Sequence, residues 1–320
     1  MQPRIVITRR VPPPAAEMLQ QAGLQVDLVD QDDPPGRDEL LRRVPGAAGL
    51  VTMLSEKVDA DLLRAAGPAL KVVANFAVGF DNVDLEACRQ RGVRVTNTPG
   101  VLTDATADLA WALILSAARR VVEGDQLVRT GRWTGWTPLQ LLGLQLTGST
   151  LGIVGAGRIG TATALRSQGF GMRVLYTDAR INYELEEKLG ARKVELPQLL
   201  AVSDVVSLHV PLTPESRHLI GAAELKSMKP TAILINTARG PVIDEKALVE
   251  ALRERRIAAA GLDVYEHEPR LTPGLTDLPN VVLLPHLGSA ATATRQKMSQ
   301  MVAENVIAVL RGHEPPNPVV

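Results

Sequence analysis

The 320-residue sequence is short of cysteine and has no excess of charge of either sign. Its single cysteine, Cys88, cannot form a disulfide within the chain, and no group of histidines and cysteines has the spacing of a zinc site. With 35 basic and 35 acidic residues the formal net charge is zero, so charge gives no reason to expect nucleic acid or an anionic membrane as a partner. These features predict a cytoplasmic protein without a structural metal.

Long apolar runs are absent as well. No run approaches the roughly 20 residues that a bilayer-spanning helix requires, and the opening residues, MQPRIVITRR, enter a strand pattern without the apolar stretch of a signal peptide. Hydrophobic residues make up 45% of the sequence and charged residues 22%, which is typical of a globular protein. A chain of 320 residues is more than one ordinary core holds, so we expect two domains.

Two stretches alternate short apolar runs with helical patterns. In residues 1–99, RIVITR precedes AAEMLQQAG and GLVTML precedes ADLLRAAG, and a second series runs from TLGIVGAG to VVLLP, residues 150–285. Such alternation predicts parallel sheets with helices on both faces. Between the two series, residues 106–131 form one long helical pattern, which we expect to be a connector. The predicted fold class is α/β with two doubly wound parallel sheets.

A glycine-rich motif opens the second series. It reads Gly155-Ala156-Gly157-Arg158-Ile159-Gly160, directly after an apolar strand and at the start of a helical pattern. In this context Gly155 permits a tight turn, Gly157 lets backbone amides approach a pyrophosphate, and Gly160 allows close packing of helix on strand. The motif predicts a dinucleotide-binding loop.

A carboxylate in the following strand supports this prediction and bears on the choice of cofactor. The strand MRVLYTD ends at Asp178, eighteen residues after Gly160, where its carboxylate would accept hydrogen bonds from the adenosine ribose. Because the same charge would repel a ribose 2′-phosphate, NAD is favoured over NADP. Arg180 lies two residues further on and could instead accommodate that phosphate, so NADP stays possible.

Three polar side chains follow later strands of the second series. Arg239 follows ILINTA, Glu268 lies in the loop after AAAGLDVY, and His286 follows VVLLP. Each has an ordinary structural explanation, as a loop cation, a surface carboxylate and a strand cap. However, ligands of open parallel sheets bind outside the carboxyl ends of the strands, so these residues could converge beside the dinucleotide loop.

The chemistry of the three residues fits hydride transfer to a carbonyl. His286 could donate a proton to the developing alkoxide. Glu268, hydrogen-bonded to the imidazole, would orient it and favour the imidazolium form. Arg239 has a planar fork suited to pairing with a carboxylate or to polarising the adjacent carbonyl. The predicted substrate is therefore a 2-oxo acid.

The sequence closely resembles the D-isomer-specific 2-hydroxyacid dehydrogenases, and within them the glyoxylate/hydroxypyruvate reductases. The matching segments are VGFDNVD (78–84), NTPGVLTDATADLAWALIL (97–115), GIVGAGRIG (152–160), LHVPLTPESRHLI (208–220), INTARGPVIDEKALVEAL (235–252), GLDVYEHEP (261–269) and LPHLGSAAT (284–292). By this resemblance His286 acts as the acid in reduction and the base in oxidation, beside Glu268 and Arg239.

The resemblance also implies roles for other residues. The backbone amides of Val78 and Gly79 would bind the substrate carboxylate, and Leu54 would form part of the pocket wall. The cofactor phosphates would be met by Thr106, beside Arg158 and Ile159 of the glycine loop. The adenine would be bordered by Val210 and Pro211. The nicotinamide would be surrounded by Thr237, Ala238 and Asp263 and closely approached by Gly288 and Ser289.

At the level of domains, the resemblance implies Rossmann-like or flavodoxin-like units with the active site in the cleft between them. Residues 1–99 and 287–320 would form a discontinuous substrate-binding domain, and residues 100–286 an NAD(P)-binding domain that includes a dimerisation helix and loop. The segment RWTGWTPL (132–139) resembles that loop, so a homodimer is expected. Its Trp136 would either reach the partner's substrate pocket or pack within the interface.

The expected activity is reduction of glyoxylate to glycolate, or of hydroxypyruvate to D-glycerate, with NAD(P)H. A formate dehydrogenase is disfavoured, because members of that type carry Gln where this chain has Glu268. Another D-2-hydroxyacid dehydrogenase, such as phosphoglycerate dehydrogenase, remains an alternative. An NAD-sensing co-repressor would also keep the three polar residues, but no charged tail marks a scaffold protein here.

Overall fold

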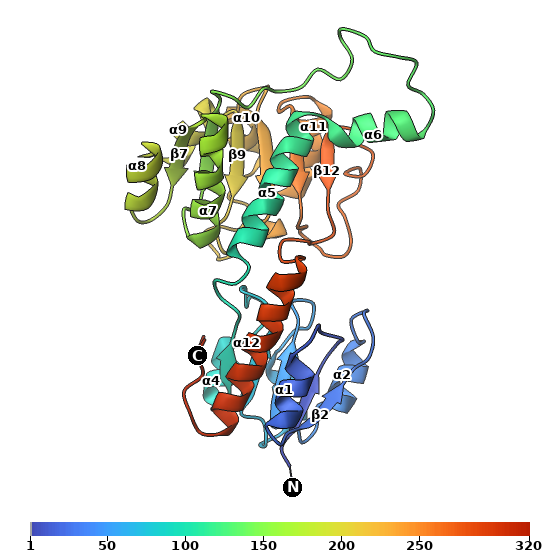
Figure 1. The fold of residues 1–320 in the computed structure, drawn as a ribbon, viewed down its shortest axis with the longest axis vertical. Helices are drawn as coiled ribbons and strands as arrows, with labels where there is room; N and C mark the ends of the chain where they lie inside the picture. The colour runs from blue at the N-terminus through green and yellow to red at the C-terminus, as the bar shows by residue number, and fades with distance from the viewer. Residues whose placement is uncertain (1) are drawn as a thin grey trace. The chain divides into compact units, whose positions relative to one another are not determined.

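The computed structural model describes residues 2–320, and their contacts divide the chain into two compact units. Unit 1 comprises the chain up to Leu102 together with Ser289–Val320, and unit 2 comprises Thr103–Gly288. The boundaries expected from the sequence, at residues 99/100 and 286/287, lie within a few residues of these. Unit 1 is therefore assembled from segments far apart in the sequence (Figure 1).

Unit 1 is built on a parallel sheet of five strands in the order β2-β1-β3-β4-β5. The strands are β1 (Arg4–Ile7), β2 (Gln25–Leu28), β3 (Gly49–Thr52), β4 (Val72–Asn75) and β5 (Arg94–Thr96). Central strands β1, β3 and β4 are almost entirely buried, as expected for apolar runs covered on both faces. The strand order reverses between β1 and β3, where ligands of such sheets bind at the carboxyl edge.

Helices cover both faces of this sheet. They are α1 (Ala15–Gln21), α2 (Arg37–Arg43), α3 (Ala60–Ala66), α4 (Leu85–Gln90) and α12 (Thr292–Leu310). Helix α12 packs against α1 and β4 (Figure 1), and its Val302 and Val306 join the apolar core around Val51. Ser299 of α12 also accepts a hydrogen bond from Ala15 N at 3.0 Å. The last helix thus supplies part of the core that the first segment begins.

Unit 2 is built on a parallel sheet of seven strands in the order β12-β11-β10-β9-β6-β7-β8. The strands are β6 (Thr150–Val154), β7 (Arg173–Thr177), β8 (Arg192–Lys193), β9 (Val205–Leu208), β10 (Ile233–Asn236), β11 (Ala259–Leu262) and β12 (Val281–Leu283). The helices are α5 (Thr103–Ala118), α6 (Val121–Arg129), α7 (Arg158–Arg166), α8 (Tyr183–Leu189), α9 (Leu196–Val202), α10 (Ala222–Ser227) and α11 (Glu245–Arg253), with short 3-10 turns η1 (Ser167–Phe170) and η2 (Gly240–Val242).

The predicted fold class is confirmed, since the chain is α/β with two parallel sheets. In unit 2 the strand order reverses between β6 and β9, so the dinucleotide motif after β6 lies at the point where ligands of such sheets bind. Within residues 2–320, none of the helices combines the length and hydropathy needed for a bilayer-spanning segment.

The connector differs from the single long helix that its pattern suggested, because it forms two helices, α5 and α6. Between them Arg120 adopts a left-handed conformation with φ of 53°, and its guanidinium pairs with Glu123 at 2.7 Å. The returning chain occupies the end of α5, where Leu144 N donates to Ala118 O at 2.9 Å. A Cβ on Gly143 would lie 2.1 Å from that same oxygen, so the close return of the chain, which has no periodic signature, ends the helix.

Candidate functional site

Loops with polar side chains gather at the carboxyl edge of the sheet in unit 2. They are the glycine loop after β6, residues 237–239 after β10, residues 263–268 after β11 and residues 284–288 after β12. This is the edge to which the sequence assigned the dinucleotide loop and the three polar residues.

Close backbone packing explains two of the glycines in the loop after β6. Gly155 has φ of +92°, and a Cβ there would lie 2.8 Å from the backbone of His209 at the end of β9. A Cβ on Gly160 would lie 2.0 Å from Gly155 O. Gly157 caps the start of α7, and a Cβ on it would meet no atom within 4 Å. The loop is thus closely packed at Gly155 and Gly160 and has open space at Gly157. This space suits the approach of a phosphate to the start of the helix.

Asp178 holds this loop from the neighbouring strand. Its Oδ2 accepts a hydrogen bond from Ala156 N at 2.8 Å, and its Oδ1 accepts one from Arg180 N at 3.1 Å. Asn182 adds a second support, since its Nδ2 donates to Ala156 O at 2.9 Å and to Thr161 Oγ1 at 2.7 Å. Sequence reasoning missed Asn182, although its position before α8 is that of a helix cap.

Glu268 and His286 form a direct pair. His286 Nδ1 lies 2.9 Å from Glu268 Oε2, and Glu268 Oε1 accepts a hydrogen bond from Tyr265 N at 3.0 Å. Burial disfavours the charged carboxylate, but the hydrogen bond and charge of His286, the Tyr265 amide and the charge of Arg239 outweigh it and hold the pKa of Glu268 below its usual value. The carboxylate therefore stays ionised and fixes the imidazole with Nε2 as its free nitrogen.

Hydrogen bonds to the two residues that follow His286 fix its backbone. His286 has φ of 58°, a left-handed conformation that is uncommon for a residue with a side chain. Asp263 accepts hydrogen bonds from Leu287 N at 2.6 Å and from Gly288 N at 2.8 Å, and Thr106 Oγ1 donates to Gly288 O at 3.0 Å. Burial raises the pKa of Asp263, against the lowering effect of these amides and of the charge on His286.

Arg239 is placed on the same edge by a close backbone contact. Its carbonyl accepts a hydrogen bond from Asn236 Nδ2 at 2.9 Å. The next residue, Gly240, packs so tightly on the Tyr265–Glu266 peptide that a Cβ would lie 1.9 Å from Tyr265 C. This contact joins the loop of Arg239 to the loop of Glu268. The positive charge of Arg239 contributes to lowering the pKa of Glu268.

His209, at the end of β9, is a half-buried histidine that sequence reasoning did not single out. Its Nε2 lies 2.9 Å from Ser207 Oγ, and its Nδ1 is buried without a hydrogen-bond partner among residues 2–320. Burial lowers the pKa of His209 to about 3. The ring is therefore neutral at neutral pH.

This buried ring gives a prediction for stability against pH. Because the folded-state pKa lies below the ordinary value of 6.5, the unfolded chain binds the proton first as pH falls. The free energy of unfolding should therefore decrease from about pH 6.5 towards pH 3, by about 2 kcal/mol between pH 7 and pH 5. Urea unfolding at these two pH values should show this loss in the wild type and not in His209→Gln. The exposed His313 provides the control, and a His209→Gln variant as acid-sensitive as His313→Gln would contradict the assignment.

The remaining sequence-predicted residues are divided between the two units. Leu54, Val78, Gly79 and Ser289 belong to unit 1, whereas Thr106, Arg158, Ile159, Val210, Pro211, Thr237 and Ala238 belong to unit 2. Leu54 follows β3, and the Val78–Gly79 loop follows β4. Trp136 lies in the loop after α6 and is 81% exposed. The structure thus brings together the glycine loop with Asp178, and Glu268 with His286, Asp263 and Gly288.

The donors and acceptors of unit 2 fit a bound dinucleotide. An open helix start, a tight glycine loop and the Asp178 carboxylate stand at one edge, and Thr237 Oγ1 is buried there without a partner among the described residues. No group of three or more His, Cys, Asp or Glu side chains within residues 2–320 is arranged to hold a metal ion.

Comparison with known proteins agrees with this geometry. The profile of the family described as D-isomer specific 2-hydroxyacid dehydrogenase, NAD binding domain, matches residues 111–288. The glyoxylate reductase of Thermococcus litoralis is 51% identical over 321 residues, covering 99% of this chain and 96% of that protein. The glyoxylate reductase of Aeropyrum pernix is also 51% identical, covering 98% and 95%.

Solved structures are also similar to this chain over its full length. A protein of Thermus thermophilus has a TM-score of 0.93 at 50% identity and covers 99% of this chain and 100% of its own. The NADPH-dependent glyoxylate/hydroxypyruvate reductase of Sinorhizobium meliloti, solved with NADP and malonate, has a TM-score of 0.87 at 35% identity and covers 100% and 97%.

Proposed function

The chain belongs to the D-isomer specific 2-hydroxyacid dehydrogenases, and on that basis we propose that it reduces glyoxylate or hydroxypyruvate to the D-2-hydroxy acid with NAD(P)H. The observation that carries the proposal is the Glu268–His286 pair, 2.9 Å apart, at the same sheet edge as the dinucleotide loop. The full-length identity of about half to glyoxylate reductases supports the choice of substrate.

In the proposed mechanism His286 supplies the proton. Glu268 holds Nδ1, so the proton on Nε2 passes to the carbonyl oxygen as that oxygen gains charge. Arg239 pairs with the substrate carboxylate and polarises the carbonyl. The nicotinamide, when bound, supplies the hydride to the carbonyl carbon. In the reverse direction neutral His286 removes the hydroxyl proton.

A substrate panel tests this function. The purified protein is mixed with NADH or NADPH and with glyoxylate, hydroxypyruvate, phosphohydroxypyruvate or pyruvate, and cofactor oxidation is followed. We expect the highest kcat/KM with glyoxylate or hydroxypyruvate. Preference for phosphohydroxypyruvate would indicate a phosphoglycerate dehydrogenase instead, and no turnover with any of the acids would contradict the proposal.

We also propose that NADH is the preferred cofactor. The support is the carboxylate of Asp178, fixed beside the glycine loop by two backbone amides, where it would repel a 2′-phosphate. Asp178→Asn keeps an oxygen for Ala156 N and removes the charge, so the kcat/KM ratio of NADPH to NADH should rise about ten-fold or more. Steady-state kinetics with both cofactors measure this ratio. An unchanged ratio, equal to that of the control Asp61→Asn at an exposed position in unit 1, would show that Asp178 does not select the cofactor.

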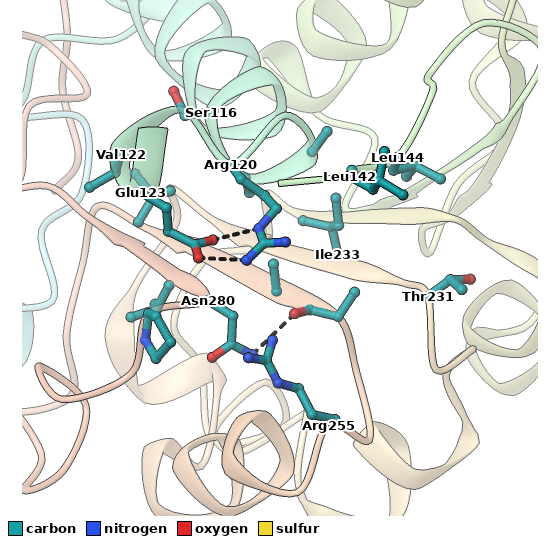
Figure 2. A pocket seen from close by; sticks show the side chains of 18 of the residues that line it. Ser116, Arg120, Val122, Glu123, Leu142, Leu144, Thr231, Ile233, Arg255 and Asn280 are labelled. Carbon is teal, nitrogen blue, oxygen red and sulfur yellow. Dashed lines mark hydrogen bonds and ion pairs between the residues drawn. The ribbon is translucent and has the colours of Figure 1, made fainter. Parts of the chain in front are cut away.

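For the assembly we propose a homodimer formed through α6 and the loop that follows it. Large apolar side chains are exposed on this part of unit 2, namely Val121, Val128, Trp133, Trp136, Leu139 and Leu142. A cavity of about 430 Å³ lies beside them, between the end of α5, the start of α6, Leu142 and the starts of β10 and β12 (Figure 2). Figure 2 shows the Arg120–Glu123 pair among the side chains that line it. A segment with this many exposed large apolar side chains suits a second copy of the same segment.

The proposed dimer makes a testable prediction. Leu139→Asp places a charge among these side chains and should shift the protein to monomers at micromolar concentration, measured by sedimentation velocity. Val202→Asp, at an exposed apolar position on α9, should leave the mass unchanged. Trp136→Ala distinguishes the two roles of Trp136, since only a residue that reaches the partner's pocket would raise KM for the 2-oxo acid while the dimer persists. A monomeric wild type would contradict the proposal.

A further inference from the structure

Unit 1 holds a buried carboxylate that the proposed reaction does not use. Glu56 lies in the loop after β3 and is only 4% exposed. Its Oε2 accepts hydrogen bonds from Thr8 Oγ1 at 2.8 Å and from Met53 N. Its Oε1 accepts one from Ser55 Oγ at 2.8 Å and pairs with Arg9 Nη2 at 2.5 Å. Because a buried carboxylate must be satisfied by donors, this set fixes the conformation of residues 53–56, which include Leu54.

One side-chain amide ties this loop to the next. Asn82, beyond β4, donates from Nδ2 to Met53 O at 3.0 Å and to Glu56 O at 2.9 Å. Its Oδ1 accepts a hydrogen bond from Asn75 Nδ2 at 3.1 Å. We call these three hydrogen bonds the Asn82 bridge. The bridge joins the loop after β3, the end of β4 and the loop after β4.

The loop after β4 is anchored through its carbonyls. Ala77 O accepts a hydrogen bond from Thr98 N, Val78 O accepts one from Asn97 Nδ2, and Gly79 O accepts one from Asn75 Nδ2, each at 2.8 Å. In contrast, Val78 N and Gly79 N have no hydrogen-bond partner within residues 2–320, and both residues are half-buried.

Two adjacent free amides held in this way can receive an anion. They follow β4 at the carboxyl edge of the five-stranded sheet, one strand away from the reversal of strand order between β1 and β3. Open parallel sheets bind ligands at this edge. Asn75 connects the two features, since it holds Gly79 O and belongs to the Asn82 bridge.

We propose that Asn82 is a positioning residue that locks Leu54 and the free amides of Val78 and Gly79 into one rigid body, so that the bridge sets the space available to a 2-oxo acid. This inference rests on the proposed function, with the added role that the family resemblance implies for those amides, which is to bind the substrate carboxylate together with Arg239. Asn82 itself does not touch the substrate. A displacement of about 1 Å in such a site lowers rates by up to about 10², so loss of the bridge has a measurable effect on substrate use.

The kinetic test compares Asn82→Ala with Asp84→Ala. Asp84 caps α4 through Ala87 N at 2.9 Å and lies two residues away, so its loss lowers the melting temperature without touching the bridge. We expect Asn82→Ala to raise KM for glyoxylate about ten-fold or more and to change the ratio of kcat/KM between hydroxypyruvate and glyoxylate. KM for NADH should stay within about two-fold of wild type. Asn82→Ser, which keeps one donor, should give an intermediate KM.

Amide hydrogen exchange tests the bridge without reference to activity. In Asn82→Ala, exchange should accelerate together in residues 53–57 and 76–83, whereas Asp84→Ala should accelerate exchange in α4 alone. Acceleration in only one of the two loops, a KM change no larger than in Asp84→Ala, or a parallel rise in KM for NADH would overturn the proposal. A wild type without 2-oxo acid reductase activity would refute the proposed function, and the exchange result would still decide whether Asn82 couples the loops.

Discussion

His286→Gln lowers kcat for reduction of glyoxylate by at least about 10², the lower end for loss of a general acid. The substitution removes the proton that Nε2 would deliver, while the glycine loop and Asp178, which make no hydrogen bond to His286, stay in place. NADH binding should therefore remain within about two-fold of wild type. Steady-state kinetics measure kcat, and a fluorescence titration measures the affinity for NADH.

A matched histidine shows whether the effect is specific. His313→Gln removes an exposed imidazole in unit 1 and should leave kcat and the NADH affinity unchanged. If His286→Gln turns over glyoxylate at nearly the wild-type rate, His286 is not the proton donor. If instead its NADH affinity falls as steeply as its kcat, the substitution has damaged the cofactor site, and the assignment of His286 to proton transfer alone is wrong.

Gly160→Ala should both destabilise the protein and weaken NADH binding by up to about 10², the upper end for the cost of overpacking. Alanine is favoured over glycine in a helix by about 1 kcal/mol, so propensity alone predicts a more stable variant. The structure predicts the opposite, because the new Cβ would lie 2.0 Å from Gly155 O. Either α7 or the phosphate loop must then move. Thermal unfolding of the protein without cofactor and an NADH titration measure the two effects.

Substitutions at two other glycines distinguish the effect of backbone packing from the effect of space for the ligand. At Gly157 a Cβ meets no atom within 4 Å, so Gly157→Ala should keep the melting temperature of the free protein but weaken NADH binding, because the pyrophosphate needs that space. Gly169, in η1, also has open space around a Cβ, and Gly169→Ala should change neither property. Equal behaviour of Gly160→Ala and Gly157→Ala would contradict the two separate roles.

The sequence predicted the features that have a local signature. Strand–helix alternation gave the two parallel sheets, because apolar period and chain length decide these elements. The motif from Gly155 to Gly160 gave the dinucleotide loop for a similar reason, since turn, amide approach and helix packing each require a glycine at a fixed spacing. The site residues of unit 2 follow from one rule, that ligands meet parallel strands at their carboxyl ends.

The features that the sequence did not predict depend on contacts between distant residues. Asn82 reaches Met53, 29 positions earlier, and an isolated Asn after a strand has no pattern that reveals such a partner. The burial of His209 is likewise a property of the packed unit and not of its segment. Periodicity predicted one helix where α5 and α6 are separate, because Arg120 adopts a left-handed conformation that no composition rule anticipates.

Unit 1 is the first of the two units to be synthesised and the last to be completed. Unit 2 is continuous from Thr103 to Gly288, so all of its strands are present before α12 is made. Unit 1 begins first, but its core includes Val302 and Val306, and its strand β5 is held by Val95 N, which donates to Val320 O at 2.9 Å. On the ribosome the first hundred residues therefore wait, with the part of the sheet that α12 covers left exposed, while the later unit folds. The core of unit 1 is thus closed only when the last segment of the chain has been made.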